Sequence, residues 1–430
     1  MFPKKLFSYV LISLSLIICS CKNNENSKTS GKIYISDAER KALISEARVF
    51  KGFDGDSPAK LSEQEIKEGP KPKKDSVEGE DYFKWNSTVT CVFSQENFDA
   101  PPSGMSPKFL CDILDTDGDI VKKGVKIKFG DLNGEVYNEA AASRLLWLLG
   151  FRHDYYFPVK VLCKDCPEED PWDFIKRYKN ISAPLAKQKM RDKYKATKMD
   201  QFFLTALIEK KFGDKIVGTE SNQSGWSFFE DLVATNDHGL KIEREALGIF
   251  AAMISHVDNQ QDNQKLACTK PKDNKCPQKN TWMIIHDLGA AMGGFRISWD
   301  WERGGPIEQA QVKTAMDIWE SNQTTGVFTG PRSCRIGVFS FQETGTMTTS
   351  KHVPVSEQGR QFILQQFARI GGGEIADDLK KPEVISLLRK QLASIFLAGR
   401  NANLYRNNDW WVDTMMNKIR LVDQHQGCLQ

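Results

Sequence analysis

The sequence predicts an α+β protein in which a β-rich part precedes a larger, mainly helical part. From about Trp85 onward, short apolar stretches alternate in the way that strands require. One strongly apolar helix lies among these strands, and beyond about residue 170 the apolar residues mostly recur at helical spacing. A chain of 430 residues, 40% of them hydrophobic, can form one large domain or two lobes with a sizeable core.

The N-terminus has the pattern of a secretory signal, which we assign to residues 1–20. Two lysines precede an apolar run from Leu6 to Ile18, which is too short to span a bilayer as a mature helix. The run ends Ile18-Cys19-Ser20-Cys21, a lipobox in which Cys21 would become the lipidated N-terminus. We therefore expect a lipid anchor in the bacterial envelope, at the outer membrane because no aspartate follows Cys21. The alternative is an ordinary signal peptide.

Residues 21–84 are predicted to be a polar tether with one or two short ordered pieces at most. They are mostly polar, with charge runs such as Gly69–Lys74. Within them, Ile35–Phe50 is a possible helix, because Ser36 and Glu39 have the spacing of a capping box.

The β-rich part is predicted to contain strands and one helix. These are strands at Thr88–Phe93, Lys108–Leu114 and Gly124–Phe129, a helix at Glu135–Leu149 and a strand at Tyr156–Leu162. An Asp-Gly turn at Asp117 joins the second and third strands as a hairpin. A calcium loop at Asp115–Asp119 is the weaker alternative, because no glutamate closes it.

The mainly helical part is predicted to follow a turn-rich connection at Cys163–Pro171. Its predicted elements are helices at Asp200–Phe212 and Glu243–His256, strands at Lys265–Cys268 and Trp282–His286, and helices at Ser356–Ile370, Glu383–Leu397 and Trp410–Leu421. 

The composition excludes a nucleic-acid-binding surface and indicates disulfides. The net charge is only +3, and no basic block is interleaved with aromatic residues. Of ten cysteines, eight remain once Cys19 and Cys21 are set aside, and an even set in an exported protein indicates disulfides. Two alternatives concern Cys163 and Cys166, which could form a redox pair or half of a zinc site with Cys268 and Cys276.

Two separated motifs carry the chemical argument. His256–Asn263 reads H-x-D-x-x-x-x-N, and an apolar strand farther on leads into Asp287-Leu288-Gly289. Protein kinases have a catalytic loop of this spacing, followed by a metal-binding Asp-Phe-Gly. Phosphoryl transfer needs such groups close together, because one carboxylate orients the acceptor hydroxyl while an amide oxygen and a second carboxylate hold metal ions.

On these motifs the chain resembles the protein-kinase-like superfamily, and within it the atypical branch of HipA-type and phosphatidylinositol-kinase-type enzymes. It also resembles uncharacterised bacterial lipoproteins that carry such a domain. The resemblance covers roughly residues 85 to 400. It implies a two-lobed kinase-like fold, with a small β-rich N-lobe containing one helix over residues 85–165 and a larger, mainly helical C-lobe over residues 166–430. It also implies ATP with Mg²⁺ or Mn²⁺ as cofactors.

The resemblance implies a role for each motif residue. Asp258 would orient the acceptor hydroxyl, and Asn263 and Asp287 would hold the metal. Lys128, in the V-x-I-K position, would contact the α- and β-phosphates, and Glu139 would pair with it. Two alternatives remain open at this point, since Lys126 shares a strand face with Lys128, and Glu135 shares a helix face with Glu139.

A second phosphate-binding element is implied by Gly104, Ser106 and Lys108. The segment resembles the short phosphate loop of HipA-type kinases, which ends in Gly-x-x-Pro-Lys. Small residues there let backbone amides approach a phosphate. The alternative is an ordinary turn rich in proline and glycine.

These observations predict an envelope-anchored, metal-dependent phosphotransferase that acts on an unknown acceptor. The alternative is a pseudokinase that serves as a lipid-anchored binding or scaffolding module. It is favoured by Gln260, which stands where typical protein kinases have a lysine that stabilises the transferring phosphate. The pseudokinase is also favoured by the expected location in the periplasm or on the cell surface, where ATP is not maintained.

A third possibility is a structural envelope lipoprotein without nucleotide. The acceptor, the choice between phosphate and AMP transfer, and the oligomeric state are left open.

Overall fold

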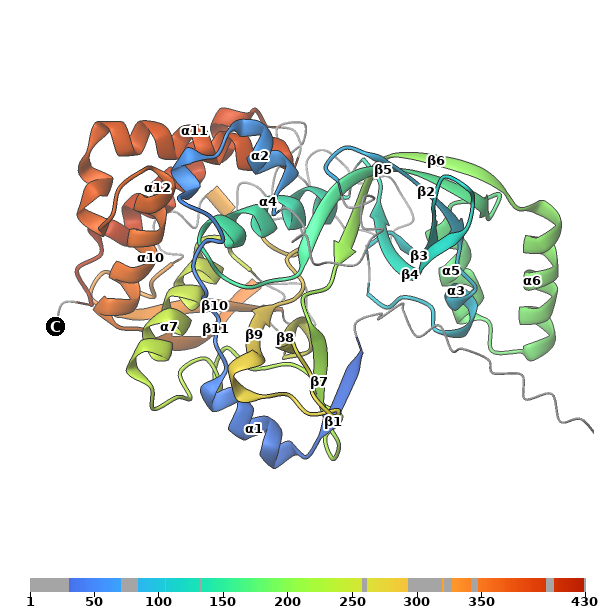
Figure 1. Ribbon diagram of the computed structural model, residues 1–430, viewed down its shortest axis with the longest axis horizontal. Helices are drawn as coiled ribbons and strands as arrows, with labels where there is room; N and C mark the ends of the chain where they lie inside the picture. Colours follow the sequence, from blue (N-terminus) through green and yellow to red (C-terminus); the bar gives the residue numbers. More distant parts are fainter. Residues whose placement is uncertain are drawn as a thin grey trace, which may run out of the picture.

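The computed structural model describes residues 31–70, 84–104, 106–131, 133–256, 261–292, 319–320, 327–341, 347–399 and 406–428. These residues form a mixed α+β structure, as predicted, with a closed five-stranded barrel beside a larger unit of helices around a four-stranded sheet (Figure 1). The signal peptide and Cys21 lie outside the described residues, as does Asp258. None of the helices in the described ranges is both long and apolar enough to cross a membrane.

The barrel has the strand order β2-β3-β4-β6-β5 and closes because β2 and β5 pair in parallel. Its strands are β2 (Thr88–Phe93), β3 (Lys108–Leu114), β4 (Ile120–Phe129), β5 (Tyr155–Cys166) and β6 (Met199–Lys210). Alternate residues of these strands fill the interior, among them Phe93, Phe109 and Ile208. The strands predicted at residues 88–93 and 108–114 are confirmed at those bounds.

Three helices cover one end of the barrel. They are α3 (Glu96–Asp99), α5 (Pro171–Asn180) and α6 (Pro184–Thr197), the last two inserted between β5 and β6. Rings of Phe98, Phe174 and Tyr194 pack against Phe93 on β2, which fixes the helices to the barrel core. Figure 1 shows α6 at the outer end of the molecule.

The larger unit is built on a sheet of order β1-β7-β8-β9. Its strands are β1 (Lys32–Ile35), β7 (Asp214–Gly218), β8 (Gln264–Cys268) and β9 (Thr281–Ile285). The helices around it are α7 (His238–Met253), α10 (Glu357–Ile370), α11 (Pro382–Ala398) and α12 (Asn408–Gln424), with a hairpin of β10 (Arg335–Phe341) and β11 (Met347–Pro354). Short helical turns are η1 (Pro58–Lys60), η2 (Gln261–Asn263), η3 (Gln278–Asn280) and η5 (Ala376–Lys380). The predicted β8–β9 pair and the helix capped by Ser356 are confirmed.

Helix α4 (Gly134–Leu148) joins the two parts. In sequence it lies between barrel strands β4 and β5, yet its residues Ala140, Ala141 and Leu145 belong to the core of the larger unit. It is therefore buried on nearly every side, and polar residues such as Glu139 and Arg144 are buried along with its apolar ones. Side chains on α4 consequently face both the barrel and the larger unit.

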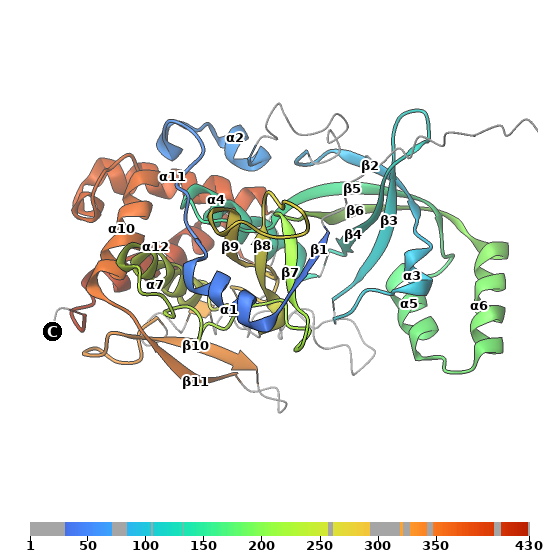
Figure 2. The same ribbon diagram turned by 60° about the horizontal axis from the view of Figure 1, so that its bottom comes forward.

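Residues 31–70 differ from the expected polar tether, because they pack as part of the larger unit. β1 pairs in parallel with β7 (Figures 1 and 2), and α1 (Asp37–Glu46) has the predicted capping box at Ser36. The apolar residues at 33, 35, 44, 49 and 66 of this segment are all buried. A prediction based on average composition misses such a segment, because the burial of a few well-placed apolar side chains is enough to pack it against the rest of the protein.

The helix predicted at Asp200–Phe212 is wrong, since this segment is strand β6. Its apolar residues fit both a helical and a strand period, and pairing with β5 along its length decides for the strand. The barrel unit therefore extends to Lys210 and not to residue 165. The predicted connection at Cys163–Pro171 instead leads from β5 into α5.

All eight described cysteines form disulfides, as predicted. The pairs are Cys91–Cys111, Cys163–Cys166, Cys268–Cys276 and Cys334–Cys428. The zinc alternative is therefore not supported in this oxidised form, because a zinc site needs thiolates that these pairs do not leave.

Candidate functional site

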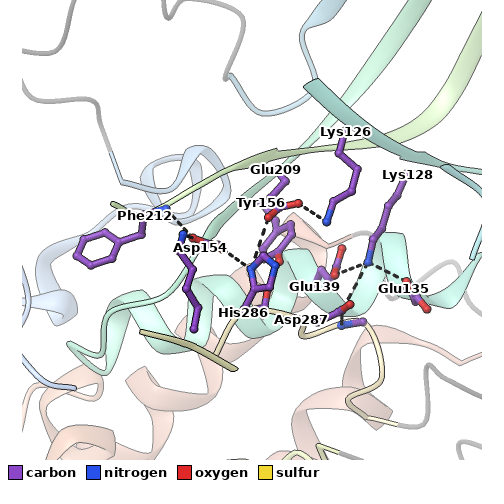
Figure 3. A network of polar contacts seen from close by, with 12 residues as sticks. Lys126, Lys128, Glu135, Glu139, Asp154, Tyr156, Glu209, Phe212, His286 and Asp287 are labelled. Carbon is purple, nitrogen blue, oxygen red and sulfur yellow. Dashed lines mark hydrogen bonds and ion pairs between the residues drawn. The ribbon is translucent and has the colours of Figure 1, made fainter. Parts of the chain in front are cut away.

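A buried lysine with three carboxylates lies where β4, α4 and the end of β9 meet (Figure 3). The Lys128 ammonium donates hydrogen bonds to Glu135 Oε2 at 2.8 Å and to Glu139 Oε1 at 2.6 Å. It also lies 3.5 Å from Asp287 Oδ1. The structure thus brings together Lys128, Glu139 and Asp287, which lie far apart in the sequence.

Local structure explains how these side chains meet. Lys128 is near the end of β4, on the strand face that points toward α4. Asn133 caps α4 by accepting a hydrogen bond from the Glu135 N–H, so both glutamates follow within the first two turns on one helix face. Asp287 lies two residues beyond the end of β9.

Asn263 lies behind Asp287. Its backbone carbonyl accepts hydrogen bonds from the N–H groups of His286 at 3.2 Å and Asp287 at 3.3 Å. The predicted pair of metal ligands is therefore adjacent in space. Asp258, between α7 and η2, lies outside the described residues, and so does Gln260.

The structure decides between the two lysines that the sequence left open. Lys126 forms an ion pair with Glu209 on β6 and not with the glutamates of α4. Lys128 contacts both Glu135 and Glu139, so the structure does not select one glutamate as its sole partner. The two glutamates differ instead in exposure. Of the two carboxylates, that of Glu139 is fully buried, whereas 15% of the Glu135 side chain is exposed.

The charges in this cluster shift one another's titration. Burial opposes the charged form of Lys128, but the carboxylates of Asp287, Glu135 and Glu139 raise its pKa well above the usual value. Burial likewise opposes ionisation of Asp287, but the three nearby lysines hold its pKa well below the usual value. For Glu139, burial and the neighbouring carboxylates raise the pKa well above its usual value despite Lys128. One more cation would therefore stabilise ionised Glu139.

The donor set fits a hard divalent cation. Glu135, Glu139 and Asp287 each offer an oxygen within 4.8 Å of the others. The second oxygen of Glu139 is buried and accepts no hydrogen bond from any residue in the described ranges. Carboxylate and amide oxygens are the ligands that Mg²⁺ and Mn²⁺ prefer.

Two buried hydrogen-bond donors from the 104–108 segment lie beside the cluster. Lys108 pairs with Lys128 in the β3–β4 register, and it is only 6% exposed. Burial, together with repulsion from Lys128, lowers the pKa of Lys108 to about 8. No carboxylate in the described part of the chain forms an ion pair with it, and the buried Ser106 hydroxyl has no hydrogen-bond partner there either. Such donors are suited to an anionic ligand.

Gly104 lets the Lys108 side chain fold against its own loop. It has a φ of 91°, and a Cβ at this position would lie 2.7 Å from Lys108 Nζ. The backbone conformation favours glycine, and a Cβ there would also displace the Lys108 ammonium. The 104–108 turn is therefore adapted to hold the Lys108 ammonium near Lys128.

A second polar network, which the sequence analysis missed, is centred on Asp154. Its carboxylate accepts hydrogen bonds from His286 Nδ1 at 2.5 Å, from the Phe212 N–H at 2.5 Å and from Lys265 Nζ at 3.2 Å (Figure 3). Burial opposes ionisation of Asp154, but Lys265 and His286 hold its pKa well below the usual value. The network links the start of β5, the chain after β6, β8 and the residue before Asp287. Only the position of His286 beside Asp287 could have hinted at it.

The histidine of the H-x-D motif is a core residue. His256 is 1% exposed at the end of α7, and burial lowers its pKa to about 4. It is therefore neutral near pH 7, and its Nε2 lies 3.3 Å from Gln264 Nε2.

Comparisons with protein-family models, curated proteins and solved structures found no match in any of the three.

Proposed function

We propose that the protein is a metal-dependent, ATP-binding phosphotransferase of the protein-kinase-like class. The observation that carries this proposal is the contact of Lys128 with both Glu139 and Asp287. In kinases, a lysine on the third strand of the small lobe pairs with a glutamate of the following helix and lies near the metal-binding aspartate. Here the lysine is on the third barrel strand in chain order, the glutamate is on the next helix, and the aspartate follows β9.

The same order of elements supports a two-lobed kinase-like fold. The barrel would be the small lobe, and the larger unit would be the C-lobe, with α7 and the β8–β9 hairpin flanking the catalytic loop. The proposed connection between the lobes is the chain that follows β6.

Each site residue then has a role in the proposed reaction. Lys128 binds the α- and β-phosphates, and Glu139 positions Lys128. The 104–108 turn surrounds the phosphates with the Ser106 hydroxyl, the Lys108 ammonium and the backbone at Gly104. Asp287 and Asn263 would hold Mg²⁺ or Mn²⁺, which would neutralise phosphate charge when bound.

The proposed chemical step is an in-line displacement at the γ-phosphorus. The acceptor hydroxyl oxygen forms a bond to phosphorus, the bond from phosphorus to the β–γ bridging oxygen breaks, and ADP leaves. The hydroxyl proton passes to Asp258, which we propose as the orienting carboxylate. If Cys21 is lipidated as proposed, the acceptor lies in the periplasm or on the cell surface.

A pseudokinase is the second candidate, and Gln260 favours it. Without a cation at that position, transfer loses an electrostatic contribution, whereas the nucleotide contacts of Lys128 and Lys108 are retained. The protein would then be an envelope-anchored module that binds nucleotide without transferring phosphate.

The test is a thermal-shift titration of the full-length protein with ATP and Mn²⁺ or Mg²⁺. A ligand that binds only the folded state adds about 2.7 kcal/mol of stability at one hundred times its Kd. We expect a metal-dependent rise in Tm that Asp287→Asn abolishes and that Asp413→Ala, an exposed control on α12, retains. Absence of any rise at millimolar nucleotide would overturn the proposal. Turnover of γ-labelled ATP then separates the enzyme from the pseudokinase.

A further inference from the structure

We infer that Glu135 is a metal ligand of the proposed site, where it binds a hard divalent cation together with Asp287. The inference rests on the proposed function and deepens it, since the kinase resemblance assigns the metal to Asn263 and Asp287 alone. The supporting observations are the packing of Glu135 against the Asp287 segment, the charge of the cluster, and the exposure of its carboxylates.

Packing holds Glu135 next to the segment that carries Asp287. A Cβ added to Gly289 would lie 2.7 Å from Glu135 Cγ, so only glycine lets the glutamate approach this closely. On the same segment, the Ala291 carbonyl accepts a hydrogen bond from Asn138 Nδ2 at 2.8 Å. The first turn of α4 is thus fixed against the residues after β9, which brings the two carboxylates to one point.

The charge of the cluster calls for a cation. Three carboxylates surround the ammonium of Lys128, the Lys108 ammonium lies beside them, and Lys126 is already paired with Glu209. The second oxygen of Glu139 is buried without a hydrogen bond from the described residues. When all three carboxylates are ionised, they exceed the ammoniums of Lys128 and Lys108 by one negative charge, so a bound cation favours this fully ionised state.

Exposure separates the roles of the carboxylates. Glu139 is fully buried behind Lys128, whereas 15% of the Glu135 side chain and 29% of the Asp287 side chain are exposed. A cation that enters with water and phosphate oxygens meets the two partly exposed carboxylates first. Mg²⁺ is usually held by one or two carboxylates together with waters and substrate phosphates, which matches this pair. Glu139 is then the partner that positions Lys128.

The test measures Mn²⁺ binding to the full-length protein by electron paramagnetic resonance, with and without a non-hydrolysable ATP analogue. We expect Glu135→Gln to weaken Mn²⁺ binding at least about tenfold and Glu135→Asp to restore part of it. Glu139→Gln should change Mn²⁺ affinity by less than about threefold while it weakens analogue binding, because it acts on Lys128. Glu383→Gln is the matched control, since Glu383 is an exposed glutamate in the first turn of another helix.

The outcomes distinguish this inference from the proposed function. If Glu135→Gln folds and binds Mn²⁺ like the wild type while Asp287→Asn does not bind it, Glu135 is not a ligand, and the proposed function stands. If Glu139→Gln loses Mn²⁺ as fully as Glu135→Gln, the division of roles is wrong. If the wild type binds neither Mn²⁺ nor the analogue, the proposed function fails, and this inference fails with it.

Discussion

Lys108 is expected to combine a cost in stability with a contribution to the proposed binding of ATP. Its ammonium is buried beside Lys128 without an ion pair in the described part of the chain, and its pKa falls from 10.5 to about 8. A shift of this size corresponds to about 3 kcal/mol of destabilisation at neutral pH. We expect Lys108→Met to raise Tm at pH 7, because methionine fills the same space without charge, and to weaken ATP binding.

The destabilisation caused by Lys108 should decrease as the pH rises. Between pH 8 and 10.5 the unfolded chain binds the proton of Lys108 more strongly than the folded protein does, so wild-type stability rises with pH in this window. The advantage of Lys108→Met should therefore be constant below about pH 8 and shrink above it. Urea unfolding at pH 7 and 10 measures this, with Lys241→Met, an exposed site on α7, as control. An unchanged advantage at pH 10 would contradict the assignment.

Single residues show how far the sequence could predict the site. The resemblance to kinase motifs nominated Lys128, Glu139 and Asp287, of which the first lies on a strand, the second on a helix and the third just beyond a strand. The sequence could not separate Lys126 from Lys128, since a strand places both on one face, and the partner Glu209 comes from a strand that was predicted as a helix. Asp154 was missed because no local pattern distinguishes an aspartate whose partners come from three other elements.

At the scale of elements, α4 depends on the N-terminal segment that docks beside it. The buried guanidinium of Arg144 donates hydrogen bonds to the Lys67 and Glu68 carbonyls at the end of α2 (Glu63–Glu68) and to the Tyr156 carbonyl. Gly69 must be glycine there, because a Cβ would lie 2.4 Å from the Arg144 guanidinium carbon. This contact holds α2 against α4, in addition to the β1–β7 pairing and the buried apolar residues of the segment.

We expect Arg144→Lys to loosen α2, because the compact ammonium of lysine lacks the planar fork whose separate nitrogens reach the α2 carbonyls and the Tyr156 carbonyl. Loss of buried hydrogen bonds of this kind costs about 1–3 kcal/mol for each group left unsatisfied. Hydrogen exchange should become faster in the amides of α2, and Tm should fall. Arg389→Lys is the control, because Arg389 forms an exposed ion pair with Asp413 that is worth at most about 1 kcal/mol. Unchanged exchange in α2 would show that Arg144 does not hold the segment.

The elements that the sequence predicted best are those with a single dominant period. β2 and β3 alternate cleanly, and α10 has both an N-cap at Ser356 and an amphipathic face. The prediction for β6 failed because its apolar run fits both a helical and a strand period. Its strand conformation comes from pairing with β5, from which it is separated in sequence by α5 and α6. Closure of the barrel could not be predicted, since it depends on the parallel β2–β5 pair, which no local signal encodes.

At the scale of the whole molecule, the disulfides differ in how much chain they constrain. Cys334–Cys428 joins residues 94 positions apart and ties the chain after α12 to the start of β10, whereas Cys163–Cys166 spans only 3 positions. In the chain-entropy account, a loop of the first size is worth about 4–5 kcal/mol and one of the second size about 2 kcal/mol. The first crosslink should therefore dominate the stability of the C-terminal part.

We expect the pair Cys334→Ser and Cys428→Ser to lower the free energy of unfolding by about 2–4 kcal/mol. The pair Cys163→Ser and Cys166→Ser should lower it clearly less, although both of these cysteines are fully buried. Urea unfolding of both double variants under oxidising conditions measures the difference, and the slope of each transition reports whether unfolding stays cooperative. Because the contact of His425 Nε2 with the Ser333 carbonyl at 3.0 Å remains in the first variant, the native packing there should persist. Equal losses in the two variants would mean that burial of the sulfur atoms, and not the length of the closed loop, sets the contribution of these crosslinks.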